Sequence, residues 1–247
     1  MKVVEYGAQH QETILLLHGG GLNGWNYQQA AQQLSGRYHV VLPTLDGHAG
    51  SDVSFTTIEN NADEIIHWVD THCAGQVLLM GGLSLGGQIL VEILSRREEI
   101  CRYAVIESAL VFPMKWTAAM IKPAYDLCYP LIRKRWFARL QFWSLHIRPD
   151  LFDVYFADTA AISKENMMAF LEANARYQLK ESLEACRAKT LVLAGSKELP
   201  IMKRSAKAIA ERMPHARLEV LQGYAHGELS LNDPEAYANK ILTLLEE

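Results

Sequence analysis

The segment Gly82-Leu83-Ser84-Leu85-Gly86 carries a serine with a glycine two positions before it and another two positions after it. It follows the apolar run Val77–Met80 and precedes a helical pattern over Gly86–Arg97. A serine in a sharp turn from a strand into a helix exposes its hydroxyl, and glycines are required where the two backbones approach too closely for a β-carbon. The sequence therefore predicts that Ser84 is a nucleophile. The competing interpretation is a glycine-rich turn with a capping serine.

A serine hydroxyl needs a base to take its proton, and His226 is the best candidate among nine histidines. Sites in open parallel sheets lie outside the carboxyl ends of the strands. His226 comes just after the apolar run Leu218–Leu221, so it lies at the correct edge. His18 and His48 also follow strands, but each sits in a glycine-rich turn where we expect structural hydrogen bonds.

The histidine in turn needs an acidic partner, for which we choose Glu198. This residue follows the penultimate apolar run, and the order Ser84, Glu198, His226 is that of a serine, acid, histidine triad on a sheet of this kind. Glu107 is the alternative, because it ends the strand that follows the nucleophile helix. An ordinary solvated carboxylate is the competing interpretation for both.

Backbone N–H groups near the nucleophile could stabilise a negative charge on oxygen. The segment His18-Gly19-Gly20-Gly21-Leu22 follows the first apolar run, and its three glycines have no side chains to obstruct their amides. We expect the amides of Gly20 and Leu85 to form an oxyanion hole. A loop that uses glycine only for its turn is the competing interpretation.

Short apolar runs alternate with longer amphipathic stretches along the chain. This alternation predicts an α/β fold, with a mostly parallel sheet covered by helices on both faces. The expected strands are Thr13–Leu17, His39–Leu42, Val77–Met80, Tyr103–Glu107, Thr190–Ala194 and Leu218–Leu221. The expected helices are Ile58–His72, Gly86–Arg97, Ile201–Met213 and Glu235–Leu245, and prolines fit the first turns of the last two.

The alternation stops in the middle of the chain, where aromatic residues and helix formers replace it. We predict a core formed by residues 1–111 and 184–247 and an inserted helical cap at 112–183. Several large apolar groups of the cap could face a substrate cavity, and we select Trp116, Met120 and Trp143 as candidate substrate-binding residues. Packing of the cap onto the core explains any one of them equally well. The basic stretch Arg133-Lys134-Arg135 with Arg139 could steer an anionic substrate such as an acyl-CoA, but we expect a solvated helix face.

Several segments together resemble the α/β-hydrolase fold superfamily, in particular serine hydrolases of the carboxylesterase and lipase type with an inserted helical cap. His18-Gly19 resembles the oxyanion turn of that family, PTLDGHAGS from Pro43 its loop after the next strand, GLSLGG its nucleophile turn and GYAHGE its histidine turn. The acid of the family is more often aspartate, and Glu107 falls where some relatives, including certain dehalogenases, carry theirs.

The resemblance implies an enzyme that hydrolyses carboxylic esters through an acyl-enzyme intermediate without a cofactor. Thioesters and carbon–carbon bonds next to carbonyls are alternative substrates for similar machinery. We expect a small-molecule ester with a small or medium apolar acyl group, and a monomer or homodimer.

Composition limits the alternatives. With 247 residues, 49% hydrophobic, the chain can bury a substantial core, and a formal net charge of −4 argues against a nucleic-acid partner. The four cysteines form no C-x-x-C pair, and the start of the chain has no apolar signal core. We therefore expect no metal site, no membrane span and a cytoplasmic location.

Two interpretations from other functional classes remain. Gly19, Gly21 and Gly24 match the glycine pattern of a dinucleotide-binding turn, and Asp46 follows at about the required distance. That interpretation leaves Ser84 and His226 without a role. The second is a ligand-binding protein of the same fold without catalysis, although the chain retains serine, histidine and acid.

Overall fold

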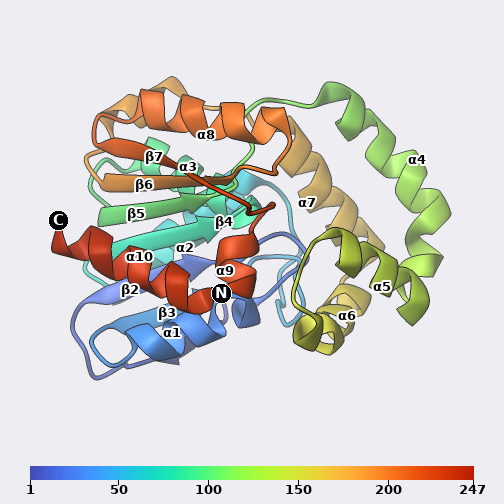
Figure 1. Cartoon of the computed structure of the whole chain (residues 1–247), viewed down its shortest axis with the longest axis horizontal. Helices are drawn as coiled ribbons and strands as arrows, with labels where there is room; N and C mark the ends of the chain where they lie inside the picture. The colour runs from blue at the N-terminus through green and yellow to red at the C-terminus, as the bar shows by residue number, and fades with distance from the viewer.

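A seven-stranded sheet forms the centre of the computed structural model, which describes all 247 residues (Figure 1). The strand order is β1-β3-β2-β4-β5-β6-β7, and only the edge strand β1 runs antiparallel to its neighbour. The strands are β1 (Val3–Tyr6), β2 (Thr13–Leu17), β3 (His39–Pro43), β4 (Val77–Leu83), β5 (Cys101–Glu107), β6 (Lys189–Gly195) and β7 (Ala216–Leu221). The predicted fold class is thus confirmed.

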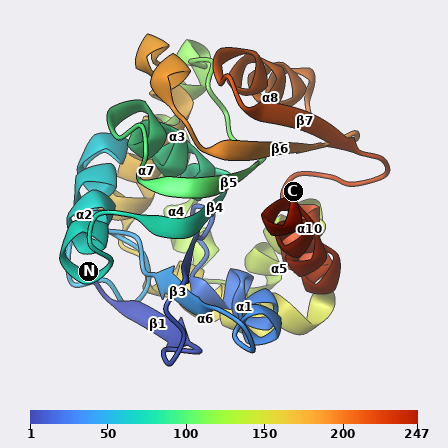
Figure 2. The same cartoon turned by 90° about the vertical axis from the view of Figure 1, so that its left-hand side faces the viewer.

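Helices cover both faces of the sheet, as the fully apolar central strands require. Figure 2 shows α2 (Ile58–His72) and α3 (Leu85–Arg96) on one side, and α1 (Gln28–Leu34) and α10 (Pro234–Glu246) on the other. Helix α8 (Pro200–Arg212) packs against β6 and β7, and the short α9 (Glu228–Asn232) precedes α10. Two separate apolar cores result, one on each face.

The predicted strands and helices all form, but strand β1 and the core helices α1 and α9 were not predicted, and α9 is only five residues long. Strand β1 is short, half-exposed and at the sheet edge, so it lacks a buried apolar run. Helix α1 is rich in glutamine and buries only Ala30, Ala31 and Leu34. Neither β1 nor α1 has the continuous apolar pattern on which the prediction depended.

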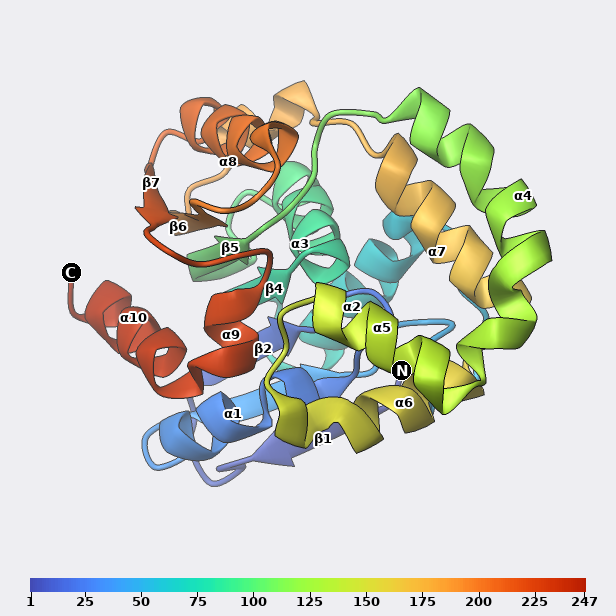
Figure 3. The ribbon, with the colours of Figure 1, turned by 45° about the vertical axis from the view of Figure 1, so that its right-hand side comes forward.

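Four α-helices lie in the segment between β5 and β6 (Figure 3). They are α4 (Lys115–Ile132), α5 (Arg135–Ser144), α6 (Phe152–Ala161) and α7 (Lys164–Arg176). Helix α7 makes the main connection to the rest of the molecule, because it packs against α4 on one side and against α2 and α3 on the other. Helices α4 and α5 therefore lie farther from the sheet.

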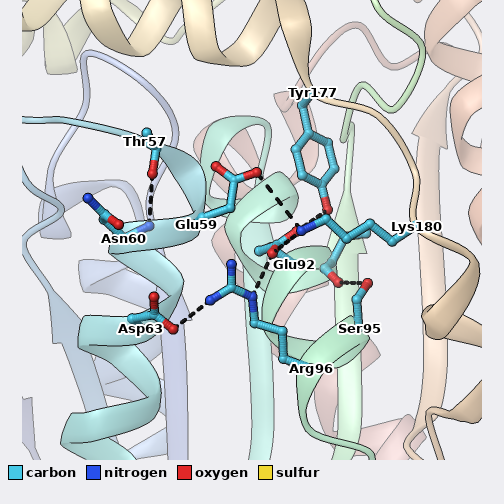
Figure 4. Close-up of polar contacts among 10 residues, drawn as sticks. Thr57, Glu59, Asn60, Asp63, Glu92, Ser95, Arg96, Tyr177 and Lys180 are labelled. Atoms are coloured by element: carbon cyan, nitrogen blue, oxygen red, sulfur yellow. Dashed lines mark hydrogen bonds and ion pairs between the residues drawn. The ribbon is translucent and has the colours of Figure 1, made fainter.

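A buried carboxylate fastens the chain after α7 to helix α3 (Figure 4). The side chain of Glu92 is completely buried and accepts hydrogen bonds from Arg96 Nε at 2.6 Å and Tyr177 Oη at 3.2 Å. Lys180 completes the cluster with an ion pair to the same carboxylate. Arg96 also pairs with Asp63 of α2. The helix that follows Ser84 is thereby held to its neighbour α2 and to the chain that returns to β6.

Candidate active site

Ser84 lies in a sharp turn between the end of β4 at Leu83 and the start of α3 at Leu85. Its backbone has φ 51° and ψ −111°, a conformation that costs energy for any residue with a β-carbon. A β-carbon at Gly82 would lie 2.4 Å from the carbonyl oxygen of Gly86, and one at Gly86 would lie 2.2 Å from that of Leu17. Both glycines are therefore required by close backbone contacts.

The three residues chosen for the triad lie together at the carboxyl edge of the sheet. Ser84 Oγ is 3.0 Å from His226 Nε2, and His226 Nδ1 is 3.0 Å from Glu198 Oε2. The three side chains come from the turn after β4, the loop after β6 and the loop after β7. This chain of hydrogen bonds is the geometry that general-base activation of a serine requires.

The carboxylate of Glu198 is held by donors on both oxygens. Oε1 accepts hydrogen bonds from the backbone N–H of Gly195 at 2.7 Å and from Ser108 Oγ at 2.8 Å, while Oε2 faces His226. Burial raises the pKa of Glu198, but the hydrogen bond and positive charge of His226, together with the other two donors, outweigh burial and leave the pKa below its ordinary value. Glu198 is therefore ionised at neutral pH and can stabilise a protonated His226.

Ser108 is a residue of the site that the sequence did not predict. It follows β5 with φ 55°, donates to Glu198 and accepts a hydrogen bond from the backbone N–H of Gly227 at 3.2 Å. One hydroxyl thus connects the acid with the loop that carries His226. No motif surrounds Ser108 in the sequence, and only its place after a central strand could have suggested it.

Glu107, the alternative acid, makes no hydrogen bond to His226. Its Oε1 accepts from the backbone N–H of Ser230 at 3.3 Å, and its buried Oε2 has no partner. Burial raises the pKa of Glu107 to about 7. A carboxyl in this state is poorly suited to stabilise an imidazolium, so the geometry favours Glu198 as the acid.

The glycine-rich loop after β2 lies beside the start of α3. A β-carbon at Gly20 would be 3.5 Å from Leu85 Cβ, and the backbone N–H groups of Gly20 and Leu85 donate to no group of the protein. The loop is fixed by His18, whose Nδ1 binds Gly19 O at 2.9 Å and whose Nε2 accepts from Leu45 N–H at 3.1 Å. Burial lowers the pKa of His18 to about 3, so the imidazole is neutral. The structural role predicted for His18 is confirmed.

Helices α6 and α7 cover this loop. Thr159 of α6 lies near Gly21, and Phe170 of α7 approaches Gly20, where a β-carbon would be 3.4 Å from its ring. Trp25 Nε1, just after the loop, donates to Asp158 of α6 at 2.8 Å. These contacts were not predicted, because the sequence does not indicate which distant segment a phenylalanine on a helix packs against.

The three candidate substrate-binding residues lie elsewhere. Trp116 and Met120 are on α4 and Trp143 is on α5, and the exposed fractions of the two tryptophans are 87% and 82%. They are directed to solvent, whereas the selection assumed that large apolar groups of the cap turn inward. Their role in substrate binding stays a prediction without support from these positions.

No three His, Cys, Asp or Glu side chains are arranged so that they could hold a metal ion. None of the helices has both the length and the apolar character that crossing a bilayer requires.

Comparison with known proteins gives three kinds of match. Residues 14–240 match the model of the alpha/beta hydrolase family. A protein of Caulobacter sp. (strain K31) named "Putative carbamate hydrolase RutD" is 23% identical over 96% of this chain and 92% of its own length.

Solved structures share the fold at lower identity. An esterase of Thermogutta terrifontis matches with a TM-score of 0.80 and 18% identity over 99% of this chain and 92% of its own. An enol-lactonase of Burkholderia xenovorans LB400 matches with a TM-score of 0.83 and 16% identity over 100% and 96%. These likenesses concern the fold alone. The family match, in contrast, spans most of the sequence and includes Ser84, Glu198 and His226. The chain therefore belongs to the alpha/beta hydrolase family.

Proposed function

We propose that this protein is a serine hydrolase that cleaves carboxylic esters of small or medium apolar acyl groups through an acyl-enzyme intermediate. The observation that carries the proposal is the unbroken hydrogen-bonded chain from Ser84 through His226 to Glu198, with 3.0 Å at each step. An ionised, buried acid behind a half-exposed histidine is what activation of the serine requires.

In the first half of the reaction, Ser84 Oγ attacks the carbonyl carbon of the ester while His226 Nε2 takes the hydroxyl proton. The resulting oxyanion is stabilised by the unpaired N–H groups of Gly20 and Leu85. The tetrahedral intermediate then breaks its bond to the alcohol oxygen, which leaves with the proton held by His226. Glu198 stabilises the imidazolium in both steps and fixes the ring.

In the second half, a water molecule attacks the acyl-enzyme. His226 takes a proton from the water, and the second tetrahedral intermediate expels Ser84 Oγ, which recovers its proton from His226. The product is the free carboxylic acid, and no cofactor takes part.

The preference for an apolar acyl group is supported by the residues beside the proposed oxyanion hole. Phe170 and Leu85 lie against Gly20, and both are buried. We also propose that residues 112–183 act as a cap over the site, with α6 and α7 rather than α4 and α5 forming its inner side. Esterases among proteins of the same fold are consistent with this substrate class.

A carbamate is a second candidate substrate, favoured by the relative from Caulobacter. Its carbonyl carbon can be attacked by the same serine, and the proton held by His226 would then go to a leaving nitrogen or oxygen. The triad alone does not distinguish the two classes.

A substrate panel tests the proposal. Nitrophenyl esters from acetyl to long acyl chains, matched acyl thioesters and nitrophenyl carbamates are compared for the wild type and Ser84→Ala. We expect kcat/KM for esters to rise toward medium chains, since each buried methylene contributes up to about 0.8 kcal/mol, and then to fall. Higher kcat/KM for carbamates than for every ester would favour the second candidate. Equal turnover by Ser84→Ala would exclude the mechanism.

A further inference from the structure

The two outer helices of the cap expose an unusual set of large apolar side chains. We define the α4–α5 face by six of them, whose exposed fractions run from 59% for Trp136 to 87% for Trp116. The six are Trp116, Met120, Leu127, Trp136, Leu140 and Trp143. Three of the five tryptophans of the chain thus lie on this face.

The spacing shows that these residues form stripes and are not scattered. Trp136, Leu140 and Trp143 follow the i, i+4, i+7 pattern on α5, and Trp116, Met120 and Leu127 share one side of α4. The opposite sides of both helices are buried, as Ala118, Ile132, Ala138 and Phe142 show. Each helix therefore has a buried apolar side and a second apolar stripe that faces solvent.

Basic residues accompany the stripes. The stretch from Phe112 to Ile147 contains six lysines and arginines and a single acid, Asp126, although the whole chain has a net charge of −4. Asp126 is already paired with Lys122 and with Lys164 of α7. Four of the six cations have no carboxylate partner, namely Lys115, Arg133, Lys134 and Arg139.

We propose that the α4–α5 face docks the protein onto an anionic lipid surface. Tryptophan and leucine side chains on amphipathic helices enter the boundary between headgroups and acyl chains, and neighbouring lysines and arginines are attracted to anionic headgroups. Both components are present on the same two helices. The docking does not depend on the proposed esterase activity.

The position of the helices suits this role. Helix α7 separates α4 from the sheet, and α4 and α5 lie at the side of the molecule away from the sheet (Figure 1). Docking through this side leaves the sheet and its helices in water.

A second copy of the chain and a nucleic acid fit the charges and apolar side chains of the α4–α5 face less well. In a symmetric dimer, the same patch of each subunit faces the other, so a second copy would bring the unpaired cations of both subunits together. Nucleic acid would bind the cations through its phosphates, but it has no apolar surface to bury the aliphatic side chains of Met120, Leu127 and Leu140. An anionic lipid surface uses both the charges and the aliphatic side chains.

Vesicle binding tests the proposal in the Ser84→Ala background, so that no lipid is hydrolysed. The probe is a vesicle of three parts phosphatidylcholine to one part phosphatidylglycerol, compared with pure phosphatidylcholine. We expect cosedimentation with the anionic vesicles, a blue shift of tryptophan emission, and weaker binding when salt rises from about 0.05 to about 0.5 M.

Two double variants test the two components of the face. Trp116→Ser with Trp143→Ser removes two anchors, and Arg133→Gln with Lys134→Gln removes two unpaired charges. Each should weaken binding about tenfold or more.

Two controls change an exposed apolar residue and two exposed cations away from the face. Val4→Ser alters an exposed apolar residue on the edge strand β1, and Arg37→Gln with Lys207→Gln makes the same change in net charge. Arg37 lies over the ring of Tyr38 as Arg133 lies over that of Tyr129. Both controls should bind within about twofold of the parent.

Several results would overturn the proposal. They are absence of binding to anionic vesicles, equal binding to pure phosphatidylcholine, or equal losses in the variants and their controls. A dimer in sedimentation experiments that is lost in Trp116→Ser with Trp143→Ser would assign the face to a second copy. Binding to single-stranded DNA but not to vesicles would assign it to nucleic acid.

Discussion

The substitution Glu198→Gln tests the acid of the triad in a way that depends on the observed hydrogen bonds. Every group that faces the carboxylate of Glu198 is a donor, namely Gly195 N–H, Ser108 Oγ–H and His226 Nδ1–H. A glutamine has only one acceptor oxygen, so its amide nitrogen must face either Gly195 N–H or His226. One donor loses its acceptor if the nitrogen faces His226, and two donors, Gly195 N–H and Ser108 Oγ–H, lose theirs if it takes the position of Oε1.

The two orientations have different costs. If the amide nitrogen faces His226, Nδ1 must accept a hydrogen bond, the proton moves to Nε2, and the imidazole can no longer take the proton of Ser84. If the amide nitrogen faces Gly195, a buried N–H is left unpaired at a cost of about 1–3 kcal/mol, and the charge opposite the imidazolium is lost. We expect kcat to fall by about 10²–10⁴-fold, which corresponds to about 3–5 kcal/mol in the activation free energy.

The assay is steady-state hydrolysis of a nitrophenyl ester by Glu198→Gln and by the matched variant Glu107→Gln, with unfolding curves to show that both proteins fold. Glu107→Gln should change kcat by no more than about threefold, since Glu107 makes no hydrogen bond to His226. A larger loss in Glu107→Gln than in Glu198→Gln would refute the reasoning and move the acid to Glu107.

The remaining predictions concern Ser108, Glu107 and Glu92. Ser108→Ala should lower kcat about tenfold with little change in KM, because Glu198 loses one of the donors that position it. It should also lower the free energy of unfolding by about 1–2 kcal/mol, because the buried N–H of Gly227 loses its acceptor. Unchanged kcat would show that Ser108 does not position the acid. Burial raises the pKa of Glu107 from 4.5 to about 7, so the folded protein keeps a proton that the unfolded chain has lost between these values, and stability falls as pH rises through them. In urea unfolding, the free energy of unfolding of Glu107→Gln should therefore exceed that of the wild type by up to about 3 kcal/mol above pH about 8, and by little below pH about 4.5. A difference that does not depend on pH would contradict the raised pKa. Glu92→Ala should lower the free energy of unfolding by about 3 kcal/mol in the same assay, because it removes the buried carboxylate that holds α3 to the chain after α7. The control Glu59→Gln, at a half-exposed side chain, should lower it by less than about 1 kcal/mol, and equal losses would count against the importance of the buried cluster.

The sheet and the hydrogen-bonded arrangement of Ser84, His226 and Glu198 could be predicted from the sequence because both follow from local patterns. Buried parallel strands are nearly continuous apolar runs, and such runs as Thr13–Leu17 allow few other interpretations. Once the strands are placed, the rule that sites lie at their carboxyl ends selects Ser84, Glu198 and His226 from many residues of the same types. Each of these residues is defined by its position after a strand and needs no knowledge of side-chain packing.

The rest of the site depends on long-range packing that leaves no local pattern. Ser108 joins the acid to the histidine loop across strands, and Phe170 reaches Gly20 from a helix far away in the sequence. The exposed positions of Trp116 and Trp143 could not be predicted for the same reason. The sequence shows that Trp116 and Trp143 are large apolar residues, but it does not show which side of each helix is covered by other elements.

Covalent labelling of Ser84 tests the central claim most directly. A fluorophosphonate probe reacts with a serine only where a base activates its hydroxyl, so we expect one equivalent of label on the wild-type protein, located on Ser84 by mass spectrometry. Labelling should be absent in Ser84→Ala and strongly slowed in His226→Ala, with both variants folded. Labelling at another residue, or equal labelling of Ser84→Ala, would contradict the assignment of Ser84 as the nucleophile.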